Sequence, residues 1–160
     1  MTCVWISDSG IRAMTQDADG RFPLETGGVL VGYVADDGDV VVHASIGPGP
    51  NAQHGRFRFT PDHAWQCGRL DSHFADSTGV NVYVGEWHTH PQGSAVMSLL
   101  DRRTLRRIAR HAQASCPRPL MLIGAGAPIG WRWQVHQYAG PALFGIGSAS
   151  TERLLKTFAA

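Results

Sequence analysis

The sequence has no long apolar run and no segment with the features of a secretion signal. Its longest apolar stretches, such as residues 80–84 and 120–123, are far shorter than the ~20 residues that a membrane-spanning helix requires. The first residues reach Asp8 without a basic segment followed by an apolar one. We therefore expect a cytoplasmic protein that does not act on membranes.

Cysteine is scarce, because the chain has only Cys3, Cys67 and Cys116. No two of them form a C-x-x-C pair, which argues against a zinc ribbon and against a dithiol redox motif. An odd number of widely spaced cysteines in such a chain indicates reduced thiols, and we expect these thiols to be buried.

An excess of charge of one sign is also missing. The chain has 14 Lys and Arg residues against 13 Asp and Glu residues, a formal net charge of +1, so it lacks the general basic field of nucleic-acid-binding proteins. One local exception is a run of arginines directly after Asp101, and it could dock an acidic partner or simply form a solvated helix face. These arginines are Arg102, Arg103, Arg106, Arg107 and Arg110.

What is present fits one compact α/β domain. With 160 residues, 43% of them hydrophobic and 17% charged, the chain is globular in composition, and we expect a single domain over residues 1–160. It is too short for a (β/α)8 barrel, which needs roughly 250 residues. The apolar patterns and turn signals predict strands at residues 4–6, 28–34, 39–46, 56–59, 80–88, 120–123 and 131–136, and helices at 8–19, 61–78, 98–114 and 151–158.

The most informative segment contains three candidate metal ligands, His88, His90 and Asp101. The two histidines are two residues apart on a predicted strand, so both imidazoles would point to the same face of the sheet. Pro91 would end that strand, and Ser98 would begin a helix with Asp101 in its first turn. Two histidine nitrogens and one carboxylate make a three-ligand zinc site with an open fourth position, which is the arrangement of catalytic zinc.

A metal-bound water also needs a base, and two glutamates are candidates. Glu86 alternates onto the same strand face as His88, where it could act as a base or orient a ligand. Glu25 is the stronger candidate, because it enters a glycine-rich strand where another backbone can approach closely.

These residues resemble the signature of the JAMM metalloproteases, also called the JAB/MPN family. That signature is a glutamate in E-x-x-G-x-L-x-G, then H-x-H-P, six residues, and S-x-x-D. This chain has the same pattern with Glu25, Gly28, Leu30 and Gly32, followed by His88, His90, Pro91, Ser98 and Asp101. The resemblance covers most of the chain, with both halves of the motif in the right order.

The resemblance implies a curved mixed β-sheet flanked by helices, of the cytidine deaminase-like type. It implies that His88, His90 and Asp101 bind Zn²⁺, that Glu25 is the general base, and that Ser98 helps to hold the developing oxyanion. Ser98 also has a plainer interpretation, because a serine three residues before Asp101 is typical of a helix N-cap. The two roles are compatible, since a hydroxyl has more than one hydrogen-bonding site.

The resemblance further implies a deubiquitinase-like isopeptidase of the stand-alone bacterial type. Such proteins remove a ubiquitin-like protein from conjugates or mature its C-terminus, and they resemble partners of E1-like and E2-like proteins in conjugation operons, including anti-phage systems. One alternative is the processing of a sulfur-carrier protein in cofactor or cysteine biosynthesis. The other is a metal-free scaffold, which predicts the loss of ligands that are all present here.

Overall fold

The computed structural model describes residues 2–141 and 148–160. Its strands are β1 (Cys3–Ser7), β2 (Gly27–Val34), β3 (Val40–Ile46), β4 (Gln53–His54), β5 (Phe59–Thr60), β6 (Val82–Pro91), β7 (Leu120–Gly126), β8 (Arg132–Pro141) and β9 (Ser148–Phe158). Its helices are α1 (Asp8–Arg21), α2 (His63–Asp76) and α3 (Leu99–Arg110), followed by a short 3-10 helix at Ala112–Ala114. Among these residues, no helix has the length and apolar character needed to cross a membrane.

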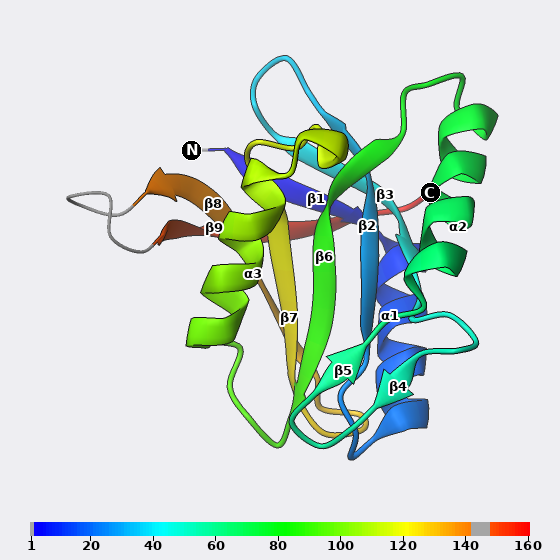
Figure 1. The fold of residues 1–160 in the computed structure, drawn as a ribbon, viewed down its shortest axis with the longest axis vertical. Helices are drawn as coiled ribbons and strands as arrows, with labels where there is room; N and C mark the ends of the chain where they lie inside the picture. The colour runs from blue at the N-terminus through cyan, green and yellow to red at the C-terminus, as the bar shows by residue number, and fades with distance from the viewer. Residues whose placement is uncertain (1, 142–147) are drawn as a thin grey trace.

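The main sheet is mixed and closes on itself. Its strand order is β1-β3-β2-β6-β7-β8-β9, and β9 pairs with β1 to complete a barrel. The β1–β3, β1–β9 and β6–β7 pairs are parallel, and the others are antiparallel. In Figure 1, α3 and α2 flank β6 on opposite sides. The predicted curved mixed sheet with flanking helices is therefore confirmed.

The first helix begins where its sequence predicts. Ser7 is the N-cap of α1, and its Oγ accepts a hydrogen bond from the backbone N–H of Gly10 at 3.0 Å. This bond satisfies one of the N–H groups that have no partner inside the helix. Met14 and Ala18 then point inward, so α1 covers one side of the barrel.

The core lies inside the barrel and under α3. Trp87 is 2% exposed and packs in the core with residues such as Val4 and Leu122. Its indole Nε1 donates a hydrogen bond to the backbone oxygen of Ile46 at 3.0 Å, so the polar atom of this buried side chain has a partner. Leu105 of α3 packs in a second cluster under the helix.

A close approach between β2 and β3 explains one glycine of the sequence motif. A Cβ atom placed on Gly28 would lie 1.8 Å from the backbone oxygen of Ile46 and 2.7 Å from Nε1 of Trp87. Any larger residue would push β2 away from β3 and from Trp87, the residue before His88. The absence of a side chain at Gly28 therefore allows β2 to pack closely against β3 and Trp87.

The prediction of a helix at residues 151–158 is wrong, because this segment belongs to strand β9. It pairs in parallel with β1 and antiparallel with β8, so it closes the barrel. Leu155 packs against the core while Leu154 is 51% exposed, which is the alternation of a strand. Long-range pairing with two open strand edges overrides the local helix preference of this segment.

Four smaller expectations also need correction. The strand predicted at 56–59 is reduced to Phe59–Thr60, and Phe57 is 88% exposed. The predicted helix 98–114 ends at Arg110, and the predicted helix 61–78 begins only at His63, with Asp62 as its N-cap. The cysteines are free thiols as expected, but only Cys3 is buried, since Cys67 is exposed and Cys116 is intermediate.

Candidate metal centre

Strand β6 places His88 and His90 side by side. Both rings project from the same face, and their Nε2 atoms are 3.0 Å apart. The ring centroids are 4.8 Å apart. Two residues at this spacing on one strand share a face because side chains alternate along a β-strand.

Helix α3 supplies the third candidate ligand, Asp101, from its first turn. Oδ1 of Asp101 lies 3.2 Å from Nε2 of His88, and Oδ2 lies 3.5 Å from Nε2 of His90. The structure therefore brings together the three residues that the sequence suggested as metal ligands. Within the described ranges they form the group that could hold a metal ion, with ligand atoms within 4.8 Å of one another.

These distances fit a tetrahedral metal ion. With metal–ligand bonds of about 2.0–2.1 Å, two ligand atoms at tetrahedral angles lie about 3.3 Å apart. The two histidine Nε2 atoms, 3.0 Å apart, are close to the spacing of two such corners, and Asp101 presents one oxygen to each histidine, Oδ1 at 3.2 Å from His88 and Oδ2 at 3.5 Å from His90. The fourth corner remains for water or substrate, which is the geometry of a catalytic rather than a structural site.

Hydrogen bonds from the loop after β6 fix the orientation of His90. Its Nδ1 donates to the backbone oxygen of Ser94 at 2.8 Å, which orients the ring with Nε2 towards His88 and Asp101. The same loop is also held by His136 of β8, whose Nε2 donates to the backbone oxygen of Ala95 at 2.9 Å. Sequence reasoning missed both contacts, because each uses a backbone oxygen that leaves no signal in the sequence.

Asp101 is fixed by a capping box at the start of α3. The N–H of Ser98 donates to Oδ2 of Asp101 at 2.7 Å, and the N–H of Asp101 donates to Oγ of Ser98 at 3.1 Å. Burial favours the neutral acid, but hydrogen bonds from His88 and His90 outweigh it and hold the pKa of the Asp101 carboxyl well below its usual range. The aspartate is thus an oriented anion, as a metal ligand must be.

Glu25 lies just before β2, at the edge of the histidine pair. Its carboxyl is partly buried, and this desolvation raises its pKa above the ordinary 4.5, while His88 and His90 lower it and Asp101 raises it. These interactions show that the carboxyl lies within electrostatic range of all three candidate ligands. A carboxyl with a raised pKa is suited to proton transfer near neutral pH.

Backbone contacts hold the Glu25 segment against β6. Thr26 donates its N–H to Oγ1 of Thr89 at 3.0 Å, and the N–H of Thr89 donates to the oxygen of Thr26 at 2.9 Å. On the other side, Nδ1 of His54 donates to the backbone oxygen of Glu25 at 2.9 Å. The separation of 29 residues between His54 and Glu25 explains why no local pattern in the sequence indicated this contact.

Glu86 lies on the same face of β6 but outside the group of candidate ligands. Its Oε1 accepts a hydrogen bond from the hydroxyl of Tyr83 at 3.4 Å. Burial raises its pKa, and His88 lowers it in part. Of the two candidate bases, Glu25 interacts electrostatically with all three candidate ligands. Glu86 instead accepts a hydrogen bond from Tyr83, three residues earlier in the chain.

Comparison with known proteins identifies the family of this chain. Residues 7–136 match the family described as prokaryotic homologs of the JAB domain. The chain belongs to this family. The match includes Glu25, both histidines and Asp101, so the predicted family is confirmed.

Relatives of this JAB-domain protein include named metalloproteases and isopeptidases. A probable metalloprotease of Sinorhizobium fredii is 40% identical over 129 residues, covering 80% of this chain and 79% of the relative. A protein of Enterobacter hormaechei named CD-NTase/cGAS isopeptidase is 35% identical over 127 residues, covering 78% of this chain and 68% of the relative. The JAB-domain protein described here is accordingly a JAMM-type metallopeptidase.

A solved structure supports the fold alone. The solution structure of a protein from Desulfitobacterium hafniense matches with a TM-score of 0.66 and 20% sequence identity, over 98% of this chain and 94% of that protein. At this identity the likeness concerns the arrangement of strands and helices of the JAB domain and not its chemistry.

Proposed function

We propose that this chain is a zinc-dependent isopeptidase that removes a ubiquitin-like protein from conjugates or matures its C-terminus. The observation that carries the proposal is the convergence of the two histidine Nε2 atoms and the Asp101 carboxylate at distances of 3.0–3.5 Å, with the Glu25 carboxyl beside them. The relatives named CD-NTase/cGAS isopeptidase support an isopeptide substrate. We further propose a role in a bacterial conjugation system with E1-like and E2-like partners, of the kind linked to anti-phage defence.

In this proposal His88, His90 and Asp101 hold Zn²⁺, and the ion would polarise the scissile carbonyl and lower the pKa of water. Glu25 accepts the proton of the attacking water and delivers it to the leaving amine. Ser98 uses its oxygen to accept from the N–H of Asp101, which leaves its hydroxyl hydrogen free to donate to a developing oxyanion. No covalent enzyme intermediate is required.

The C-terminal tail of a modifier would lie extended beside a sheet edge and pair through main-chain hydrogen bonds. The main sheet closes into a barrel, so the edges next to Glu25 are those of the two-stranded β4–β5 sheet. β4 contacts the Glu25 segment through His54. We therefore place the tail along β4–β5, with its last residues directed to the metal.

We extend the proposal to residues 1–160 as one catalytic domain in the cytoplasm. The core clusters join β1, the central strands and β8, and α3 packs on the same barrel. The substrate is a protein conjugate, and neither nucleic acid nor a membrane is part of the reaction.

The test combines metal content with cleavage of a panel of ubiquitin-like and sulfur-carrier fusions. We expect about one zinc ion per chain and cleavage of at least one ubiquitin-like fusion. Glu25→Gln should keep the zinc and lose at least about 100-fold in kcat, because it removes only the base. Cleavage confined to a sulfur-carrier fusion would replace the substrate class, and a protein that takes up no zinc and cuts nothing would overturn the proposal.

A further inference from the structure

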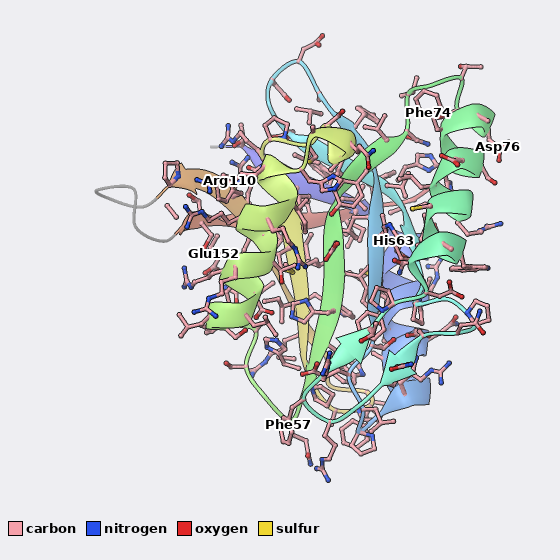
Figure 2. All side chains as sticks on the ribbon, in the orientation of Figure 1. Phe57, His63, Phe74, Asp76, Arg110 and Glu152 are labelled. Atoms are coloured by element: carbon pink, nitrogen blue, oxygen red, sulfur yellow. The ribbon has the colours of Figure 1, made fainter. Side chains whose placement is uncertain are left out.

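One face of α3 is strongly cationic. At 3.6 residues per turn, Arg103, Arg106, Arg107 and Arg110 fall within an arc of about 100°. The opposite side carries the buried residues Asp101, Leu105 and Ile108. We call the outward side the α3 arginine face, defined by these four arginines, and Arg110 marks its far end in Figure 2.

Charge is unevenly distributed between this helix and the rest of the molecule. Helix α3 has five arginines and one aspartate, a net charge of +4, and that aspartate is buried in the candidate metal centre. The remaining residues have nine basic and twelve acidic side chains, a net charge of −3. The helix macrodipole favours only a few cations, near the C-terminus, so it does not explain arginines along three turns.

Among the described residues, no carboxylate forms a close ion pair with the four arginines of this face, and the internal carboxyl that senses one of them is Glu86, whose pKa Arg107 lowers. The four arginines instead line an open groove of about 460 Å³, together with His111. A groove lined by four arginines is suited to bind an anionic surface.

An exposed apolar patch lies at the end of the helix next to the candidate metal centre. Leu99 and Leu100 are 76% and 67% exposed, and Val96 in the preceding loop is 62% exposed. The solvent side of α3 therefore begins with leucines beside the ligand Asp101 and continues as arginines for about 15 Å, from residue 100 to residue 110. Helix α3 has no aromatic side chain on which a nucleotide base could stack.

We propose that the α3 arginine face docks an acidic surface of the protein substrate, with Leu99 and Leu100 contacting an apolar border of that surface. The inference rests on the proposed function, because it takes the substrate to be a protein conjugate. Docking along α3 positions the conjugate over the helix that carries Asp101, so binding and metal coordination use opposite sides of one rigid element. Long-range attraction would also speed the encounter between enzyme and conjugate.

Binding of a defined anionic probe tests this without catalysis. The probe is a fluorescein-labelled peptide of about 12 residues with alternating Glu and Leu, compared with its Lys counterpart and with an oligothymidylate of equal charge. Anisotropy is measured on the zinc-loaded wild type, on Arg103→Glu/Arg107→Glu, and on Arg12→Glu/Arg69→Glu. The last variant changes the net charge equally at exposed positions of α1 and α2.

We expect the acidic peptide to bind, to weaken with added salt, and to lose about tenfold in affinity only in the α3 variant. Equal losses in both variants would reduce the effect to general charge and overturn the proposal. Oligothymidylate binding tighter than the peptide would overturn it in favour of a nucleic-acid surface. A circular dichroism melt of each variant checks that it folds, and Arg103→Gln/Arg107→Gln gives a milder version of the same test.

A second arm uses a fusion protein that the wild type cleaves. Arg103→Glu/Arg107→Glu should raise KM about tenfold with little change in kcat, while Arg12→Glu/Arg69→Glu leaves both unchanged. Normal KM in a cleaving α3 variant would overturn the docking proposal and leave the proposed function standing. Arginine-dependent peptide binding by a protein that cleaves no fusion would overturn the assignment of the docked surface to a substrate.

Discussion

At the scale of single residues, the candidate centre depends on how precisely side chains are held. His90 is fixed through Ser94, and Asp101 is fixed through Ser98. Such supporting hydrogen bonds orient ligands before a metal arrives and strengthen their binding. The chemistry therefore depends as much on backbone oxygens and a capping serine as on the ligands themselves.

The pKa of Glu25 is a direct test of its surroundings. In the metal-free protein we expect its carboxyl to titrate above 4.5, because burial is the largest influence on it. Zinc loading should lower this pKa, since a divalent cation nearby favours the carboxylate. Carbon-13 NMR of the side-chain carboxyl, assigned with Glu25→Gln, measures both values. An ordinary or lowered pKa in the metal-free protein would contradict the structure.

Ser98 is expected to have two separable roles. Glycine is nearly as good as serine at an N-cap, so Ser98→Gly should cost only a few tenths of a kcal/mol in the free energy of unfolding. It also removes the hydroxyl, so kcat should fall about 10-fold or more if this group stabilises the oxyanion. Urea unfolding and steady-state kinetics on the same preparation measure both effects. Unchanged kcat would restrict Ser98 to its capping role.

At the scale of secondary-structure elements, close strand packing positions the centre. β2 must lie near β3 and β6 for the Glu25 segment to reach the histidines on β6. The short distance at Gly28 makes this arrangement possible, because no side chain separates the strands there.

Gly28→Ala and Gly20→Ala make a matched pair for this packing. The added methyl group at Gly28 would lie 1.8 Å from the oxygen of Ile46, so we expect a loss of about 1–3 kcal/mol in the free energy of unfolding. At Gly20 in α1, nothing lies within 4 Å of the added methyl group, and the change should be neutral or stabilising by up to about 1 kcal/mol. Chemical denaturation compares the two, and equal effects would contradict the strand geometry.

The strand assignment of β9 predicts unequal effects at two adjacent leucines. Leu155 packs on the core and Leu154 faces solvent. Leu155→Asp should therefore cost about 2 kcal/mol or more, since it buries a charge without a partner, while Leu154→Asp should change stability by less than about 0.5 kcal/mol. Thermal melts of both variants test this, and comparable losses would indicate that the segment is not a strand of the barrel.

At the scale of the whole molecule, metal binding should be linked to folding. The ligands come from β6 and α3, which are joined by a loop, so an ion bound to all three exists only in the folded chain. Zinc at about 100 times its dissociation constant would add about 2.7 kcal/mol to stability. We expect a chelator to lower Tm and zinc to restore it, with no response in His88→Ala/His90→Ala. An unchanged Tm of the wild type after zinc is added or removed would contradict a preformed metal site.

The sequence was sufficient for the candidate site because its chemistry is local. His88 and His90 share a face through strand periodicity, and Ser98 and Asp101 share one helix turn, so spacing alone indicated which atoms could converge. The sequence also predicted the strands at 28–34 and 39–46 and the start of the first helix at residue 8, since these depend on neighbouring residues. His54 and the loop oxygens of Ser94 and Ala95 left no such signal, because their partners are distant in the chain or are backbone atoms.

Only the tertiary structure decided the closure of the barrel, the strand at the C-terminal end and the exposed arginine face. Residues 151–158 form a strand because β1 and β8 offer open edges at that place, and pairing across the molecule outweighs local preference. The exposed state of the arginines depends likewise on which side of α3 packs against the sheet. Sequence determined which groups could do the chemistry, and long-range packing determined where they lie and what surrounds them.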